Sequence, residues 1–363
     1  MGGIVNPIVN HTGDDPSTAW KTEHGEWRLI GNQGGGQGGA PIYGSMDFKS
    51  WYKVGFTTLK LGDCPTFFPL PSITPGSAAG LTDADYAAMP NYVHKAGSGN
   101  DQVQVGTWTD GQPGPEGVGT AGTWVQHGGS VPLDNGKTHA SKDFWDPVKK
   151  RRIMWVWGTL KGGLQTIPRD MTYNPKTNKI NYAPVEEMNG LRGKVLSKLQ
   201  GGTSPMTLAA SSASDMEISF KRPTQSSSNT GAAVDRFSVS ASGGTFYIDY
   251  TGTGTAACGF AAVPSMLQAN SVDSTGKPVQ SVDTVDILDT DTEITMRIFF
   301  DNNVAEVYFM GGRVAMTVEI PNRPSDYTVK VMASPTAELI NATSWQMGSI
   351  HVDQHTVLAT PRL

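Results

Sequence analysis

The sequence has 363 residues, enough for two domains, and its 43 glycines and 23 prolines suit strands and tight turns better than helices. Its net charge of −5 offers no basic surface for nucleic acid or acidic lipid, whereas a neutral partner such as a sugar is compatible with it. No apolar run is long enough to cross a membrane, and the first residues lack the basic start and apolar core of a signal peptide.

The sequence gives no sign of a disulfide framework, a metal site or a phosphate cradle. Its only cysteines are Cys64 and Cys258, and we expect them not to pair. There is no Cys/His cluster with metal-ligand spacing, and no helical pattern follows the glycine-rich run 34–39. We therefore expect no metal and no organic cofactor.

The first half of the chain reads as short strands joined by turns. Strands are predicted at residues 27–30, 40–45, 91–95 and 102–109. Further along, strands at 138–144 and 153–157 flank the turn that Asp146 and Pro147 begin. Hairpins at this regular spacing are typical of propeller blades.

The composition changes between residues 188 and 214, where 191–199 reads as a short helix or an extended connector. We place a domain boundary there, giving domains 1–195 and 196–363. The second domain has alternating strands that predict a β-sandwich. These strands are expected at residues 237–241, 245–250, 292–300, 304–309, 314–320 and 327–333.

Two acidic stretches indicate a possible chemistry. Asp-Cys-Pro-Thr-Phe-Phe-Pro-Leu occupies residues 63–70, and Asp-Asp-Pro-Ser-Thr-Ala-Trp occupies residues 14–20. Prolines exclude a helix at 63–70, which instead reads as a strand with Asp63 at its end. Alone, Asp63 could be an ordinary turn aspartate. Two carboxylate loops beside aromatics, however, suggest glycoside chemistry, which needs two carboxyl groups across the scissile bond.

The order of several motifs resembles glycoside hydrolase family 32, the family of invertases, fructan hydrolases and fructosyltransferases. The resemblance rests on 15–20 and 63–70, on Gly-Ala-Pro-Ile-Tyr-Gly-Ser-Met-Asp-Phe-Lys-Ser-Trp at 39–51, and on the stretches 140–147, 151–158 and 164–169. It implies an all-β fold in which a five-bladed β-propeller, here incomplete at its N-terminus, is followed by a β-sandwich.

The resemblance also implies roles for individual residues. Asp15 matches the family's transition-state stabiliser, and Asp63 matches its acid/base glutamate but is one methylene shorter. Asp14 takes the place of a family arginine, which puts two carboxylates side by side. Cys64 matches the family cysteine, and we interpret it as a residue that packs beside the acid and shapes its pocket.

Other residues are candidates for substrate contact. Trp20 and Phe68 are the aromatics nearest the acidic loops and could stack on a sugar ring. Asp134 either touches substrate, as the resemblance suggests, or belongs to a hairpin turn formed with Asn135 and Gly136.

The family's nucleophile lies in an Asn-Asp-Pro-Asn-Gly motif, which does not occur before Asp15. We expect either a fragment of a longer protein or a degenerate member of the family. The implied function is retaining β-fructofuranosidase chemistry on sucrose or a fructan. The alternative is a non-catalytic carbohydrate-binding or regulatory protein of the same fold. Two glycosylation triplets and the family's habit favour a secreted or vacuolar location, and the oligomeric state stays open.

Overall fold

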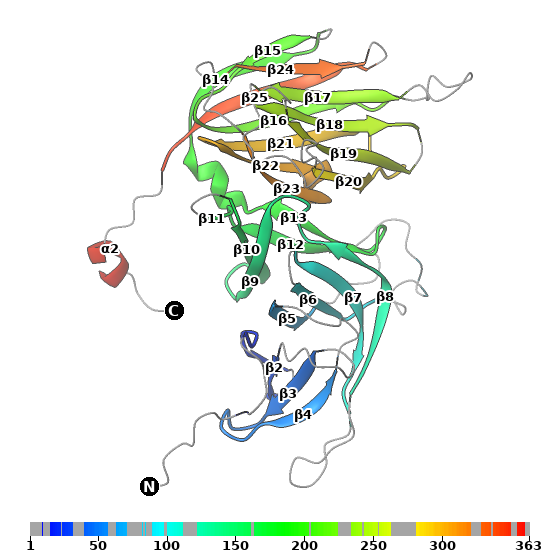
Figure 1. Ribbon diagram of the computed structural model, residues 1–363, viewed down its shortest axis with the longest axis vertical. Helices are drawn as coiled ribbons and strands as arrows, with labels where there is room; N and C mark the ends of the chain where they lie inside the picture. The colour runs from blue at the N-terminus through cyan, green and yellow to red at the C-terminus, as the bar shows by residue number, and fades with distance from the viewer. Residues whose placement is uncertain are drawn as a thin grey trace, which may run out of the picture. The chain divides into compact units, whose positions relative to one another are not determined.

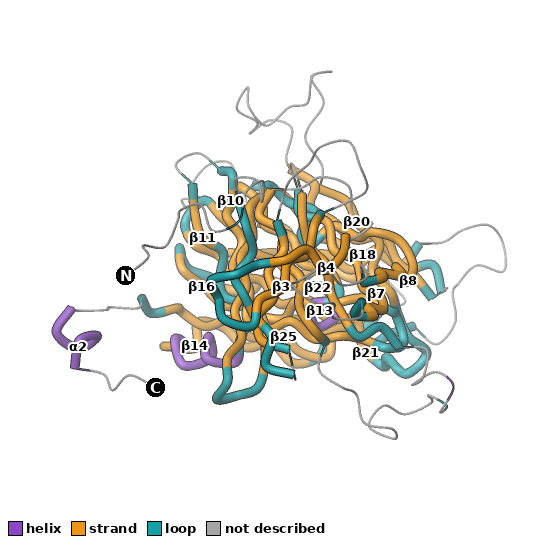
Figure 2. The backbone as a smooth tube through the Cα atoms, turned by 90° about the horizontal axis from the view of Figure 1, so that it is seen from below, coloured by secondary structure: helices purple, strands orange, loops and turns teal. Residues whose placement is uncertain are grey.

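The computed structural model is built almost entirely of β-strands (Figure 1; Figure 2). It describes residues 9, 15–22, 24–31, 40–56, 63–70, 82, 84, 89–97, 100–111, 122–160, 163–202, 205–223, 234–241, 243–252, 254–262, 281–320, 328–334, 337–349 and 354–359. Within these ranges, no helix is both long and apolar enough to span a bilayer. The described α-helix is α2 (Gln354–Ala359).

The chain packs into two compact units. Unit 1 comprises residues 1–183 together with the later segment 312–317, and unit 2 comprises residues 184–311 and 318–363. Unit 1 therefore includes a piece of chain that is far away in sequence. The division lies at Ala183 and Pro184, and the boundary placed after residue 195 stays a prediction for independently folding domains.

Unit 1 contains three blade-like antiparallel sheets among its described residues. The first runs in chain order through β1 (Trp20–Lys21), β2 (Trp27–Ile30), β3 (Pro41–Ser45) and β4 (Tyr52–Phe56). The second runs through β5 (Asp63–Pro69), β6 (Tyr92–Gly97), β7 (Gln102–Thr109) and β8 (Thr123–Pro132). The third has β9 (Thr138–Asp146), β10 (Arg151–Gly158), β11 (Leu164–Gln165), β12 (Arg169–Asn174) and β13 (Lys179–Pro184).

Each of these sheets has its first strand, β1, β5 or β9, at an edge, and β5 also contacts β9 and β2. Apolar side chains between the first two sheets form a buried core that includes Ile30, Ile42, Phe67 and Trp108. Trp20 packs on this core, with its ring centroid 5.7 Å from that of Phe67. The first strands of the three sheets are therefore neighbours, and residues at the same level along these strands can contribute to one site.

Two six-stranded sheets lie in unit 2, except that residues 314–317 of the last strand of one sheet, β23, are assigned to unit 1. One follows the order β14 (Arg192–Gln200), β25 (Leu339–Met347), β16 (Ala213–Lys221), β21 (Glu293–Asp301), β22 (Val304–Phe309) and β23 (Val314–Glu319). The other follows β15 (Met206–Ala209), β24 (Thr328–Ala333), β17 (Asp235–Ala241), β18 (Gly244–Tyr250), β19 (Thr255–Ala262) and β20 (Ser281–Asp286).

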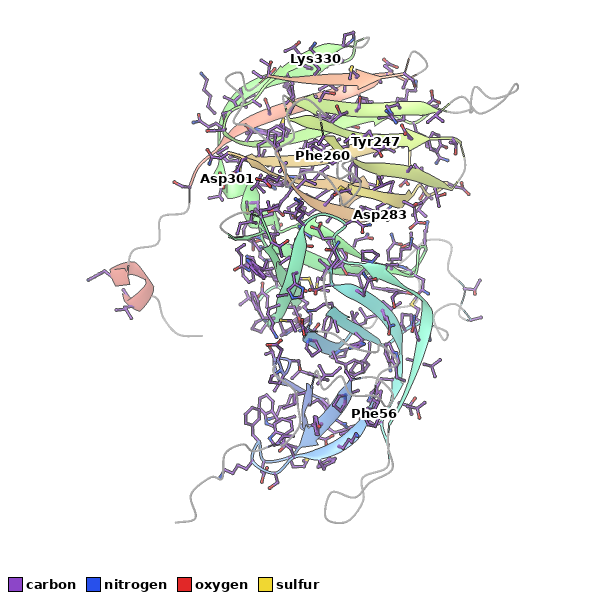
Figure 3. The ribbon with its side chains drawn as sticks, in the orientation of Figure 1. Phe56, Tyr247, Phe260, Asp283, Asp301 and Lys330 are labelled. Atoms are coloured by element: carbon purple, nitrogen blue, oxygen red, sulfur yellow. The ribbon has the colours of Figure 1, made fainter. Side chains whose placement is uncertain are left out.

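Buried residues alternate along these strands because one face of each sheet turns inward. Ile218, Phe220, Phe237 and Val239 are at most 2% exposed, and the rings of Phe220 and Phe237 lie 5.2 Å apart. Figure 3 labels Tyr247 on β18 and Phe260 on β19 in this unit. The predicted β-propeller followed by a β-sandwich is therefore confirmed as the fold class.

Residues 191–199 were expected as a short helix or an extended connector. The chain there is extended and forms most of strand β14, which follows the 3-10 helix η2 (Glu186–Leu191). The partner of β14 is β25, which begins at Leu339. A pairing over such a sequence distance leaves no local signal in the strand itself.

The expectation for the cysteines holds in the described residues, since Cys64 and Cys258 are both free.

Candidate active site

Asp63 is the first residue of β5, and its side chain is 52% exposed. The register between β5 and β6 shifts between Asp63 and Thr66, and Cys64 has a positive φ of 49°. A bulge of this kind turns a side chain away from the regular alternation of the strand. The carboxyl group of Asp63 therefore stands at a strand end and is open to solvent.

A buried lysine fixes the backbone beside Asp63. Lys95 on β6 is fully buried, and its ammonium group donates to the backbone carbonyl of Cys64 and, at 2.8 Å, to that of Ser141 on β9. The same ammonium lies 3.4 Å from Asp101 Oδ2, which accepts the backbone N–H of Ser141 at 2.7 Å. Burial lowers the pKa of Lys95, and the charge of Asp101 opposes that shift. Lys95 thus ties the start of β5 to β9.

His139 and Asp15 lie at the same end of the first strands. The Nε2 atom of His139, the second residue of β9, is 3.8 Å from Asp63 Oδ2. Asp15 precedes β1, and the chain after it is held by the bond from Ser17 N–H to the carbonyl of Ile30 at 2.8 Å. Asp15 is close enough to Cys64 for its negative charge to raise the pKa of the Cys64 thiol.

Burial raises the pKa of the Cys64 thiol, and the negative charges of Asp15 and Asp101 act in the same direction, against those of Lys142 and Lys95. The thiol is the unreactive form of cysteine. This environment agrees with the interpretation of Cys64 as a packing residue.

Substrate contact by Trp20 and Phe68, the two predicted stacking aromatics, stays a prediction. Both line a cavity of about 570 Å³ at the carboxyl ends of β1, β5 and β9. Each lies five residues after the acid in its own motif, and extended chain advances about 3.3 Å per residue. Asp15 and Asp63 do not line this cavity.

Asp134 is 1% exposed, and its carboxylate is already occupied. Its Oδ1 accepts the N–H groups of Gly136 and Thr317, and its Oδ2 accepts Arg169 Nη2 and the Thr317 hydroxyl, all within 2.9 Å. This geometry is that of a turn formed with Asn135 and Gly136, because Asp134 Oδ1 accepts the N–H of Gly136. Substrate contact by Asp134 stays a prediction. Asp14 lies outside the described residues.

The sequence reasoning missed Lys95, Asp101 and His139. Each becomes a neighbour of Asp63 or Cys64 only through the pairing of β5 with β6 and its contact with β9. All residues of β6 from Val93 onward are buried, so no inward–outward alternation singles out Lys95. In the described part of the chain, no group of three His, Cys, Asp or Glu side chains is arranged to hold a metal ion.

Two adjoining domain descriptions match the chain: "Glycosyl hydrolases family 32 N-terminal domain" over residues 6–183 and "Glycosyl hydrolases family 32 C terminal" over residues 176–346. The chain belongs to glycoside hydrolase family 32. The two matched segments meet where the compact units of the structure divide.

Curated relatives of this family 32 chain include two proteins of Arabidopsis thaliana. "Beta-fructofuranosidase, insoluble isoenzyme CWINV6" is 31% identical over 58% of this chain and 42% of its own length. "Acid beta-fructofuranosidase 4, vacuolar" is 26% identical over 94% of this chain and 60% of its own length. The chain thus spans about half the length of these relatives.

Solved structures of family 32 proteins share the fold. Fructan 1-exohydrolase IIa from Cichorium intybus superposes with a TM-score of 0.68 at 22% identity, covering 92% of this chain and 72% of the other. Exo-inulinase from Aspergillus awamori gives a TM-score of 0.65 at 14% identity, covering 95% and 71%. The likeness extends across both the propeller-type unit and the sandwich.

Proposed function

We propose that this chain supplies the acid/base and the transition-state stabiliser of a retaining β-fructofuranosidase acting on sucrose or a fructan. The observation that carries the proposal is the half-exposed carboxyl group of Asp63 at the start of β5, with His139 at 3.8 Å and the charge of Asp15 acting on Cys64. Two carboxylates at neighbouring strand ends can flank one glycosidic bond.

In this proposal Asp63 donates its proton to the glycosidic oxygen as the bond to the fructosyl carbon breaks. It later accepts a proton from the water, or from the sugar hydroxyl, that attacks the fructosyl intermediate. Asp15 holds sugar hydroxyls and stabilises the positive charge that develops on the ring. The nucleophile of family 32 belongs to the Asn-Asp-Pro-Asn-Gly motif, which the printed sequence does not contain. The proposal for this chain is limited to Asp15 and Asp63.

Lys95 supports the proposed acid by fixing the carbonyl of the next residue, Cys64. A carboxyl group on a bulged strand end needs such an anchor, because a displacement of about 1 Å can reduce a rate on the order of a hundredfold.

The comparisons support the substrate class. A solved structure of fructan 1-exohydrolase IIa is described in complex with 1-kestose, and one of fructofuranosidase from Schwanniomyces occidentalis in complex with fructose. We extend this to the present chain as binding of sucrose or a short fructan. We also propose a secreted or vacuolar location, since relatives are named as a vacuolar and a cell wall form.

The test is release of fructose from sucrose and from 1-kestose by the natural full-length protein and by its Asp63→Asn variant. We expect release by the natural protein and a loss of about a hundredfold or more in the variant, the typical range for removal of a general acid. Sugar binding without fructose release would overturn the proposal in favour of a non-catalytic carbohydrate-binding protein.

A further inference from the structure

The chain contains two asparagine–glycine pairs, and the structure holds them in different surroundings. One is Asn189–Gly190 in η2 of unit 2, and the other is Asn135–Gly136 in the turn after β8 of unit 1. Such a pair can lose ammonia without an enzyme, because glycine has no side chain to keep its backbone nitrogen away from the asparagine carboxamide carbon. The reaction therefore depends on how freely that nitrogen moves and on how strongly the carboxamide is polarised.

The carboxamide of Asn189 is polarised by a guanidinium group. Its Oδ1 accepts Arg297 Nη2 at 2.8 Å, and the same guanidinium binds the buried carboxylate of Asp215 at 2.8 and 3.1 Å. Because Asp215 holds the planar Arg297 fork, this donor is fixed in position beside Asn189. A cationic donor stabilises the negative charge that Oδ1 acquires when a nucleophile adds to Cγ.

The nucleophile is the backbone nitrogen of Gly190, which lies at an open position. Asn189 and Gly190 are both exposed, and apart from the neighbours of Gly190 in η2 no atom lies within 4 Å of the place that its Cβ atom would take. η2 is a 3-10 helix of six residues, and 3-10 hydrogen bonds have poorer geometry than those of an α-helix. The backbone of η2 can therefore open locally and bring this nitrogen toward Asn189 Cγ.

Asn135–Gly136 lacks that freedom. The Gly136 N–H donates to Asp134 Oδ1 at 2.7 Å, and Gly136 is buried against the backbone of Thr317. A negative charge beside an N–H group opposes the loss of its proton, and the turn cannot move without displacing Thr317. Asn135 is therefore the internal reference for Asn189.

We propose that Asn189 is a site of spontaneous deamidation, with water as the co-reactant. The Gly190 nitrogen gives its proton to solvent and bonds to Asn189 Cγ, the bond from Cγ to Nδ2 breaks, and Nδ2 takes a proton from water and leaves as ammonia. Water then opens the cyclic succinimide at Cγ to give aspartate, or at the backbone carbonyl carbon to give isoaspartate. The net change replaces a neutral carboxamide by a carboxylate beside Arg297.

The two products act differently on unit 2. In the aspartyl form, the new carboxylate keeps the bond to Arg297 as an ion pair. In the isoaspartyl form, the backbone of η2 gains one methylene group, which displaces the carbonyl group of residue 189 that accepts the Arg192 N–H. Because the Arg192 side chain binds Asp215 and Glu217, the isoaspartyl form loosens the start of β14.

The experiment incubates the full chain at mildly alkaline pH and follows its peptides by liquid chromatography and tandem mass spectrometry. Gly190→Ala is the matched variant, because a methyl group at this position fits the folded chain but shields the nitrogen from Cγ. Arg297→Lys keeps a positive charge beside Asp215 and removes the fork that reaches Asp215 and Asn189 together. Circular dichroism before incubation verifies that each variant is folded.

We expect the peptide with Asn189 to convert into an aspartyl and an isoaspartyl form while the peptide with Asn135 stays intact. In urea, where the fold holds neither pair, both peptides should convert. Gly190→Ala should nearly abolish conversion at Asn189, and Arg297→Lys should slow it roughly two- to tenfold, the effect of one lost hydrogen bond.

Several results would overturn the proposal. These are an unchanged Asn189 peptide in the folded chain, equal conversion of the two pairs, and aspartate without isoaspartate, which indicates direct hydrolysis. Conversion of Arg297→Lys at the natural rate would overturn the polarisation by Arg297. None of these measurements involves fructose release, so the deamidation site and the proposed function are judged independently.

Discussion

The side chain of Asp63 is one methylene shorter than the glutamate that the family resemblance places there. Its carboxyl group is half-exposed and stands at a bulged strand end, so space exists in front of it for a longer side chain. The reach of this carboxyl group is therefore set by the length of the side chain and not by crowding.

We expect Asp63→Glu to increase the rate of fructose release, because the added methylene brings the proton about 1 Å closer to the glycosidic oxygen. The gain should lie within roughly a hundredfold, the scale that such displacements carry. The measurement is kcat/KM for sucrose, with Asp63→Asn as the inactive reference. A clear loss of rate in Asp63→Glu contradicts the assignment of Asp63 as the acid/base.

His94 on β6 pairs with Phe67 and lies in the core, where it is fully buried and its ring is 6.2 Å from that of Phe67. Burial, assisted by the charge of Lys95, lowers the pKa of His94 to about 3. The folded protein thus keeps this imidazole neutral at pH values where an unfolded histidine, with its ordinary pKa near 6.5, takes up a proton.

This difference predicts acid sensitivity. Between pH 6.5 and pH 3 the unfolded chain binds one proton more at His94 than the folded chain, so stability falls as the pH falls, by up to about 1.4 kcal/mol per pH unit. We expect His94→Phe to show a smaller loss between pH 6.5 and pH 5 in urea unfolding. If the two proteins lose stability in parallel, His94 does not remain neutral in the folded state.

The turn 134–136 packs very closely against the backbone of Thr317. A Cβ atom added to Gly136 would lie 1.7 Å from the carbonyl oxygen of Thr317, which is backbone and cannot swing away. Gly129 on β8 has no atom within 4 Å of the corresponding position. Gly136 has no room for a side chain and Gly129 has ample room, so Gly129 is a suitable control for Gly136.

We expect Gly136→Ala to destabilise unit 1 by at least about 2 kcal/mol, since the backbone of the turn must move to admit a methyl group. Gly129→Ala should change stability by no more than about 0.5 kcal/mol, because its methyl group points into open space. Thermal or urea unfolding of both variants measures this. Equal stabilities would show that the turn does not lie against Thr317.

Some of these elements could be predicted from the sequence, and others could not. The Asp63 and Asp15 motifs are local, and hairpins such as β9 and β10 are encoded by adjacent residues, so both could be predicted. Sequence proximity alone suggested that Trp20 and Phe68 stack on substrate beside the acids, and this stays a prediction.

Lys95 and His139 could not be predicted from the sequence as neighbours of Asp63. Their proximity to Asp63 depends on strand pairing between distant segments, and nothing in either segment encodes the partner. The same holds for β14 and its pairing with β25.

For the molecule as a whole, unit 1 depends on a residue from late in the chain. The Thr317 hydroxyl bonds to Asp134 Oδ2 at 2.8 Å and to Arg169 Nη2 at 2.9 Å, and both partners are fully or nearly fully buried. Eight of the nine tryptophans lie in residues 1–183, the exception being Trp345. Intrinsic fluorescence therefore reports almost entirely on unit 1.

We expect Thr317→Val to lower the stability of unit 1 by about 1–3 kcal/mol, because the buried carboxylate and guanidinium each lose a hydrogen bond at unchanged shape. The tryptophan-detected unfolding midpoint should fall. Thr207→Val, an exposed site on β15 in unit 2, should leave that midpoint unchanged. A midpoint that Thr317→Val does not move contradicts the contribution of this segment to unit 1.

The late position of residues 312–317 has a consequence for synthesis on the ribosome. Thr317 follows Ala183 by 134 residues, so Asp134 and Arg169 emerge well before the hydroxyl that completes their network. At roughly 5–20 residues per second, the nascent propeller-type unit waits roughly 7–27 s for its last segment. During that interval the ion pair of Asp134 and Arg169 lacks the hydrogen bonds of Thr317, and the turn 134–136 is uncovered. The nascent chain is then most exposed to chaperones and proteases, and codon choice between Ala183 and Thr317 sets how long that exposure lasts.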